Sequence, residues 1–174
     1  MSEQEVRYPY LDTPAVLVDM EKLEANIGEM AQVAAEAGVE LRTHLKAHGC
    51  PSIARMQIEA GACGVEVGNV DQAEVMADEG INDIMIVHPF YGERKLEKLR
   101  RLVSKPGLNL SVVIDMIEQA TGLSQLGQAV GVKIPVHIKV ETGGNRYGVL
   151  PGDPVLSLVK ELRQLPGVDF GGIY

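Results

Sequence analysis

Short apolar runs alternate with longer amphipathic stretches along almost the whole chain. Most of the short runs are rich in valine and isoleucine, as buried strands are, and the longer stretches repeat their apolar residues at helical spacing. The pattern predicts strands at 15–18, 39–45, 63–67, 83–87, 109–114, 134–140 and 170–174. The predicted helices lie between them, at 20–37, 51–60, 71–79, 93–103, 115–130 and 153–164.

Several helix boundaries are marked by residues with capping preferences. Asp19 precedes the first helix and can accept hydrogen bonds from its first backbone amides, and Gly38 can end that helix in a left-handed conformation. Asp71, with Glu74 three residues later, fits a capping box at the start of another helix, which ends at Gly80. These signals support strands that alternate with single helices.

Strands separated by single helices pair in parallel through right-handed crossovers. This order fits a doubly wound sheet as well as a barrel, but a repeat of roughly 20–30 residues matches a (β/α)8 TIM-type barrel of ~250 residues. If strand 15–18 lies outside the barrel, about six barrel strands remain, whereas a closed barrel needs eight. We therefore predict an α/β fold in which residues 1–174 form an incomplete barrel domain.

Composition narrows the classes of partner. The 174 residues include 16 basic and 24 acidic side chains, and the net charge of −8 argues against nucleic acid or an anionic membrane as the main partner. No run approaches the roughly 20 apolar residues of a membrane span, and residues 1–7 are polar, with no signal segment. Cys50 and Cys63 lack metal-site spacing. We expect both to be buried, reduced thiols in a cytoplasmic protein.

The first segment with candidate chemistry runs from Arg42 to His48, at the end of a predicted strand. Side chains alternate along a strand, so Arg42, His44 and Lys46 are expected to face one side. Three basic groups on one face of a buried strand are costly without partners, and barrel active sites lie at the carboxyl ends of strands. Lys46 is therefore a candidate catalytic amine, although a strand that simply ends in solvent with an exposed lysine also fits.

A second segment, residues 139–148, also follows a predicted strand. His137, Lys139 and Glu141 are expected to share one face of that strand. The glycines allow a tight loop that brings backbone amides and Arg146 toward a ligand, and a guanidinium suits an oxyanion or a phenolate. A glycine-rich turn with a solvent-exposed arginine explains the same residues, so this segment alone does not establish a site.

The other histidines carry weaker signals. His88 ends a predicted strand and could face the pocket, but a structural role fits it at least as well. His48 and His137 have no partner at a metal-ligand spacing. We therefore assign no metal site to any residue of this chain.

Three motifs, in this order, resemble one family. They are TPAVLVD at 13–19, RTHLKAH at 42–48 and ETGGNRYG at 141–148. Together they look like the D-threonine aldolase and D-serine dehydratase group, which belongs to the alanine-racemase-like, fold type III enzymes of pyridoxal 5'-phosphate (PLP). The resemblance covers nearly the whole chain, from about residue 13 to the end. It implies an N-terminal PLP-binding TIM-type barrel domain followed by a C-terminal β-domain.

The resemblance implies roles for five residues. Lys46 matches the lysine that binds PLP covalently, and Arg146 matches the arginine that hydrogen-bonds the phenolic oxygen of the cofactor. Lys139 matches a lysine that orients this arginine in alanine racemases, where it is carbamylated; only the position is carried over. Tyr174 matches a tyrosine that lies against the cofactor, and His44 matches the histidine of the lysine motif.

The sequence departs from the family pattern beside the lysine and in length. Thr43 stands where the family usually has proline and Gly49 where it usually has lysine, and neither change removes Lys46. The family's remaining strands, its phosphate-binding loops and its C-terminal β-domain, which carries the metal ligands, are absent from this sequence. We therefore expect residues 1–174 alone to be inactive, and we expect a divalent metal only with the missing C-terminal part.

Three functions fit the resemblance. The first is a PLP-dependent lyase of the D-threonine aldolase or D-serine dehydratase type, which acts on small D-β-hydroxy amino acids as a homodimer. The second is an amino-acid racemase of the alanine type, and the third is a non-catalytic PLP-homeostasis protein that has the barrel without the β-domain. The opening motif and the form of the lysine motif favour the lyase, which is our prediction.

Overall fold

The computed structural model describes residues 8–174, so the polar segment 1–7 lies outside the described residues. Six strands form one sheet: β1 (Arg42–His44), β2 (Gly64–Val67), β3 (Asp83–Ile86), β4 (Asn109–Ile114), β5 (Ile134–Ile138) and β6 (Val168–Ile173). The helices are α1 (Met20–Ala37), α2 (Pro51–Glu59), α3 (Val70–Asp78), α4 (Glu93–Val103), α5 (Ile117–Val130) and α6 (Asp153–Leu162), and a 3-10 turn, η1 (Leu45–Ala47), follows β1. Within residues 8–174, no helix has the length and apolar composition needed to cross a bilayer.

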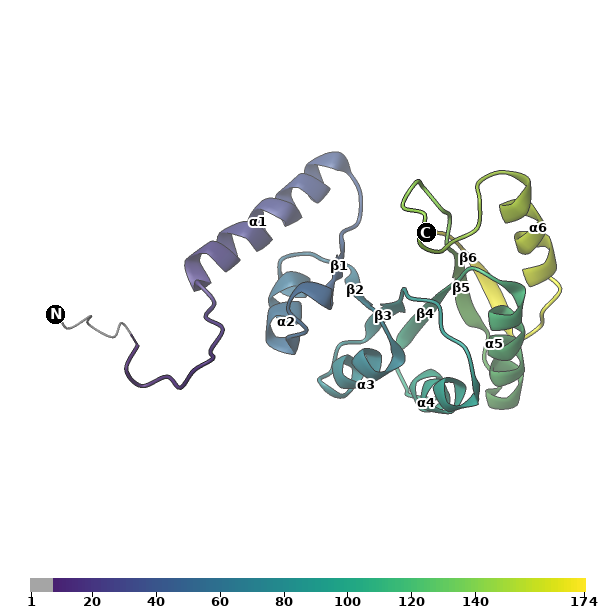
Figure 1. Ribbon diagram of the computed structural model, residues 1–174, viewed down its shortest axis with the longest axis horizontal. Helices are drawn as coiled ribbons and strands as arrows, with labels where there is room; N and C mark the ends of the chain where they lie inside the picture. The colour runs from purple at the N-terminus through teal and green to yellow at the C-terminus, as the bar shows by residue number, and fades with distance from the viewer. Residues whose placement is uncertain (1–7) are drawn as a thin grey trace.

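All neighbouring strands pair in parallel, in the order β1-β2-β3-β4-β5-β6. One helix connects each strand to the next, as parallel pairing requires. Figure 1 shows α2 to α6 along the outer side of the curved sheet, with α1 set apart at the N-terminal end. The predicted α/β fold of about six barrel units is confirmed. A doubly wound sheet, whose strand order reverses at a switch point, does not fit this order.

The two faces of the sheet bury different side chains. Val65 of β2 and Ile84 of β3 are fully buried against the helices, in the larger hydrophobic core. Alternate residues point to the opposite, inner face, where Met85, Val87 and Val113 form a second, smaller cluster. Other inner-face positions carry polar side chains, among them Glu66 of β2 and His137 of β5.

The start of α3 differs from the prediction. Asn69, not Asp71, is the N-cap, and its side-chain oxygen accepts a hydrogen bond of 2.9 Å from the Gln72 backbone amide. Asp71 lies on the solvent side and forms ion pairs with Lys95 (3.1 Å) and Lys98 of α4. Asparagine caps helices as well as aspartate does, so the residue nearer the end of β2 takes the capping position.

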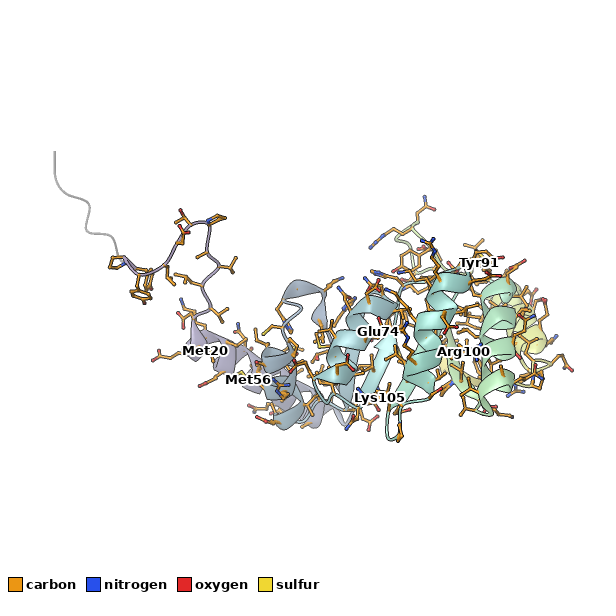
Figure 2. All side chains as sticks on the ribbon, turned by 90° about the horizontal axis from the view of Figure 1, so that it is seen from below. Met20, Met56, Glu74, Tyr91, Arg100 and Lys105 are labelled. Atoms are coloured by element: carbon orange, nitrogen blue, oxygen red, sulfur yellow. The ribbon has the colours of Figure 1, made fainter. Side chains whose placement is uncertain are left out.

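Further ion pairs lie on the solvent side of α3 and α4, where Figure 2 labels Glu74 and Lys105. Glu74 of α3 lies 3.9 Å from the Arg101 guanidinium, and the Lys105 ammonium lies 3.1 Å from the Asp78 carboxylate. Figure 2 also shows Tyr91 and Lys105 at opposite ends of α4. Exposed pairs of this kind contribute little stability each, so the packing of the two helices depends mainly on their buried apolar faces.

The N-terminal part departs most from the prediction. Asp19 and Gly38 cap α1 as predicted, but residues 15–18 form no strand, and Val16 is 95% exposed. A strand needs a neighbour that satisfies its backbone groups, and none lies beside 15–18 within the described part of the chain. The first barrel strand is also shorter than the predicted 39–45, because the chain turns into η1 directly after β1.

Helix α5 lies in backbone contact with the turn that precedes β6. A Cβ atom on Gly127 would overlap the carbonyl oxygen of Gly167 and would approach the Val132 carbonyl oxygen to 2.8 Å. The Gly167 backbone amide also donates a buried hydrogen bond of 3.0 Å to the Ser124 hydroxyl. This contact fixes β6, and therefore the residues at its end, relative to α5.

Gly127→Ala should destabilise the protein by roughly 1–3 kcal/mol, the usual cost of an extra methyl group in a filled space. Gly28→Ala is the matched control, because Gly28 is exposed on α1 with nothing within 4 Å of the added carbon. That helix should gain roughly 0.5–1 kcal/mol from the better propensity of alanine. Urea unfolding followed by circular dichroism measures both changes, and equal stability of the two variants would contradict the close backbone contact.

Candidate active site

The five residues singled out by the sequence all lie at or just beyond the carboxyl ends of strands. Lys46 is in η1 after β1, His44 ends β1, Lys139 follows β5, Arg146 is in the next loop, and Tyr174 follows β6. The carboxyl ends of parallel strands meet at one edge of the sheet, where barrel enzymes have their active sites. The charges of Lys46 and Arg146 both act on Lys139. Lys46, which follows β1, and Arg146, which follows β5, are therefore close enough to influence the charge of the same lysine.

The chain turns sharply at Lys46. Because β1 ends at His44, η1 takes Lys46 out of line with the strand, so it does not continue the predicted alternation of Arg42 and His44. Leu45 is buried (2% exposed) and anchors the turn, whereas Lys46 is exposed. The Lys46 backbone amide donates a hydrogen bond of 3.3 Å to Nδ1 of His44. An anchored turn therefore presents an accessible amine at the open end of the sheet.

His44 begins a series of ring contacts beside this amine. The ring centroids of His44 and His88 are 6.2 Å apart, and the ring of His88 meets that of Tyr147 edge-on at 5.9 Å. Burial lowers the pKa of His44; the charge of Glu66 opposes this effect, and those of Lys46 and His88 add to it. Since Nδ1 of His44 accepts a backbone hydrogen bond, its neutral ring carries the proton on Nε2. His44 can therefore act as a neutral hydrogen-bond donor.

Lys139 lies over two aromatic rings. Its Nζ is 4.2 Å from the ring centroid of Tyr174 and 5.1 Å from that of Tyr147. A cation in this position is attracted by the negative face of each ring. Burial lowers the pKa of Lys139; the carboxylate of Glu66 opposes this effect, and the guanidinium of Arg146 adds to it. The two tyrosine rings and the Glu66 carboxylate thus stabilise the Lys139 ammonium, although the cations Lys46 and Arg146 are nearby.

Tyr174 covers the small apolar cluster of the inner face. Its ring packs against Met85, Val87 and Val113, and its hydroxyl donates a hydrogen bond of 3.0 Å to Oε2 of Glu66. Burial raises the pKa of Tyr174, and the negative charge of Glu66 raises it further. Tyr174 is therefore a neutral phenol with a fixed ring plane.

The loop that carries Arg146 is folded around its own carboxylate. Glu141 accepts hydrogen bonds from the backbone amides of Gly143 (2.5 Å) and Arg146 (3.2 Å). Hydrogen bonds from backbone amides, that of Asn145 first among them, lower the pKa of Glu141. The carboxylate therefore stays ionised and organises the loop instead of facing a ligand.

A second carboxylate fixes the far end of this loop. Asp115, just after β4, accepts a hydrogen bond of 3.2 Å from the Gly148 backbone amide. Gly148 has a φ of +121°, and a Cβ atom there would approach the Glu141 nitrogen to 2.9 Å, so the position requires glycine. Between these two ends Arg146 is exposed, with Cζ 5.4 Å from the ring centroid of Tyr147. The loop thus holds an arginine that can reach a ligand.

Three residues of this site were not assigned from the sequence. Tyr147 and Glu66 were missed, and His88 was left undecided between the pocket and a structural role. Glu66 had a local signal, because it is a charged residue between the apolar Val65 and Val67 in a buried strand. Tyr147 had none beyond its place next to Arg146.

The remaining candidates lie outside this cluster. His137 is half-buried on the inner face beside Gly171, and its pKa is lowered by burial and by the charge of Arg42. Cys50 and Cys63 are free thiols, but they are half-buried rather than buried as we predicted. Among residues 8–174, no three His, Cys, Asp or Glu side chains gather in a way that could hold a metal ion.

The cluster suits a small ligand that combines an aldehyde, an aromatic ring and anionic oxygens. Lys46 supplies an accessible amine that can attack the aldehyde. Arg146 supplies a planar cation for an anionic oxygen, and Tyr174 supplies a fixed ring as a wall. PLP has all three of these groups, so the residues present fit this cofactor.

Comparisons with known proteins agree with this fit. The family model described as alanine racemase, N-terminal domain, matches residues 18–174. The D-threonine aldolase of Arthrobacter sp. is 38% identical over 166 residues, which are 94% of this chain and 42% of that protein. The D-threo-3-hydroxyaspartate dehydratase of Delftia sp. (strain HT23) is 30% identical over 94% of this chain and 43% of its own length.

A solved structure shows the same arrangement. The crystal structure of D-threonine aldolase from Filomicrobium marinum matches with a TM-score of 0.88 and 39% identity, over 94% of this chain and 43% of that one. Among the sequence relatives, alanine racemases also match, at 23–30% identity. The chain spans about 42–43% of the length of the first curated relatives. From the matched family model and this fold, the chain belongs to the alanine racemase N-terminal domain family of fold type III PLP enzymes.

Proposed function

We propose that the full protein is a PLP-dependent lyase that acts on small D-β-hydroxy amino acids, by aldol cleavage or by dehydration. The observation that carries this proposal is the convergence of Lys46, Arg146, Lys139 and Tyr174 at one end of the sheet. Its support in the comparisons is that the relatives at 38–39% identity are named D-threonine aldolases. Because this chain spans less than half of their length, the activity belongs to the whole protein.

In this proposal each residue has a separate task. Lys46 binds the cofactor covalently, Arg146 donates to its phenolic oxygen, and Tyr174 lies against its ring. PLP, when bound, supplies an electron sink for the bond that breaks at the substrate α-carbon. With PLP bound, the amine of Lys46 would be the candidate of this chain for proton transfer at the substrate α-carbon. His44 and Lys139 lie at the same end of the sheet, where His44 can donate through Nε2.

A divalent metal, a homodimer and a cytoplasmic location are part of the same proposal. A solved structure of a cysteine mutant of the Delftia dehydratase is described as the metal-free form. That description supports a metal in the relative, and we expect any metal ligands of the present protein to lie outside residues 8–174. The expected partner is a small amino acid, since the net charge of −8 does not favour nucleic acid or an anionic membrane.

The substrate class can be tested with enantiomer pairs. Full-length protein is incubated with the D- and L-forms of threonine, serine and alanine, with and without a chelator. We expect turnover of D-threonine or D-serine, little turnover of the L-forms, and loss of activity with chelator, because a bound metal assists the β-hydroxyl as a Lewis acid. Formation of glycine and acetaldehyde from D-threonine would identify the aldolase. Formation of pyruvate and ammonia from D-serine would identify the dehydratase.

Two other outcomes would replace the lyase. Racemisation of alanine that is insensitive to chelator would identify an amino-acid racemase. Absence of turnover on all six amino acids, despite bound PLP, would favour a PLP-homeostasis protein.

A further inference from the structure

Glu66 is a carboxylate on the inner face of the sheet, in the middle of β2. Its neighbours Val65 and Val67 are fully buried in the outer core, so the alternation of the strand directs Glu66 to the opposite face. In the parallel register Glu66 stands directly opposite His44 on β1 and Met85 on β3. It is therefore next to the strand that leads to η1 and beside the apolar cluster under Tyr174.

Two kinds of contact connect Glu66 with the opposite side of the site. The Tyr174 hydroxyl donates to its Oε2 at 3.0 Å, across 108 positions of sequence. Its negative charge also acts on Lys139, whose Nζ lies 4.2 Å from the centroid of the Tyr174 ring. Tyr174 thus lies between the Glu66 carboxylate, which accepts from its hydroxyl, and the Lys139 ammonium, which lies over its ring. The three residues come from β2, the end of β6 and the end of β5.

The charges that face Lys139 show why this carboxylate matters. Lys46 comes from η1 and Arg146 from the loop after β5, and both are cations. Glu141, also in that loop, is a second anion that raises the Lys139 pKa, but its effect is smaller than that of Glu66, and its oxygens accept hydrogen bonds from the backbone amides of its own loop. The other neighbours, the rings of Tyr147 and Tyr174, carry no net charge. Glu66 is therefore the anion with the larger effect on Lys139, and the Tyr174 hydroxyl that it holds lies on the ring beneath the Lys139 ammonium.

We propose that Glu66 is a positioning residue of the cofactor pocket. Its carboxylate holds the Tyr174 hydroxyl and keeps Lys139 protonated over the tyrosine ring. The Tyr174 ring and the Lys139 ammonium form the wall that faces the ligand, and Glu66 then fixes the positions of both. A half-buried carboxylate on an otherwise apolar strand is costly unless it is paired, and here the pairing is with two residues of the pocket. The assignment of this wall to PLP rests on the proposed function; the coupling of Glu66 to Lys139 does not.

The test measures the ionisation of Lys139 in the full-length protein after removal of PLP. Acylation of each lysine by an amine-reactive reagent is followed against pH, and the modified peptides are quantified by mass spectrometry. Glu66→Gln should lower the pKa of Lys139 by about one unit, because an opposite charge nearby is lost. At a pH below both values, acylation of Lys139 should then be roughly tenfold faster. Lys22, which is exposed on α1, is the internal control, and its rate of acylation should not change.

Three further variants separate charge from packing. Glu66→Asp keeps the charge and should restore the Lys139 pKa. Tyr174→Phe keeps the carboxylate and the ring but removes the hydroxyl, so its effect on Lys139 should be smaller than that of Glu66→Gln. Glu66→Leu should lower the Lys139 pKa as Glu66→Gln does, and it keeps the test available if the half-buried amide of Glu66→Gln prevents folding. An unchanged Lys139 pKa in the folded Glu66→Gln or Glu66→Leu variant would overturn the proposal.

A second readout connects the pair to the cofactor. The dissociation constant for PLP should rise several-fold in Glu66→Gln and recover in Glu66→Asp. If the wild-type protein binds no PLP, the proposed function fails while the Lys139 titration still decides the coupling. If PLP binds normally to Glu66→Gln and the Lys139 pKa is shifted, the positioning role is refuted although the coupling exists.

Discussion

Lys46→Ala should reduce turnover by the full-length protein on the order of 10³-fold, the typical loss when a group that transfers a proton in the reaction is removed. The variant should also lose the visible absorption of the covalently bound cofactor. Lys46 is the accessible amine of an anchored turn at the open end of the sheet. Lys139 cannot substitute for it, because its ammonium is held over the rings of Tyr147 and Tyr174.

Covalent trapping identifies the lysine directly. Borohydride reduction of the PLP-loaded wild-type protein, followed by peptide mapping, should place the label on Lys46. Lys46→Arg is the matched variant, since it keeps the positive charge and removes the primary amine. It should fold like the wild type and bind PLP without a reducible bond. A label on Lys139, or on no lysine, would contradict the assignment of Lys46.

Where local pattern and local packing agree, the fold could be predicted from the sequence. Helix 93–103 and strand 109–114 coincide with α4 and β4, because each has its own periodicity and a clear end. Residues 15–18 have strand composition as well, but a strand also needs a partner, and a run of four residues carries no information about one. The strand at 15–18 was therefore predicted wrongly because its local sequence does not show whether a neighbouring strand is available to pair with it.

The site shows the same division between local and non-local information. Lys46 and Arg146 lie in short motifs that can be recognised in one segment of the chain. The contact of Tyr174 with Glu66 joins β6 to β2, and its geometry depends on the curvature of a six-stranded sheet. Periodicity indicates which side of a strand a residue faces, but it does not indicate which distant residue it meets there.

Arg146→Leu should raise the dissociation constant for PLP roughly tenfold to hundredfold, which corresponds to the loss of a charge-assisted hydrogen bond of about 1.5–3 kcal/mol. Two carboxylates, Glu141 and Asp115, fix the backbone around this arginine, so little further ordering is needed when it binds a ligand. Arg146→Lys should recover part of the affinity, because an ammonium keeps the charge but lacks the planar pair of donors. Titration of the apo protein with PLP, followed by absorbance, measures all three affinities.

Arg163→Leu is the control for net charge, because Arg163 is exposed at the end of α6, away from the carboxyl ends of the strands. Its affinity for PLP should match that of the wild type. Arg146→Leu should also raise the pKa of Lys139, since one of the two cations that lower it is removed. Wild-type affinity for PLP combined with a raised Lys139 pKa would show that Arg146 lies beside the pocket without contacting the cofactor, and the role carried over from the family motif would then be wrong.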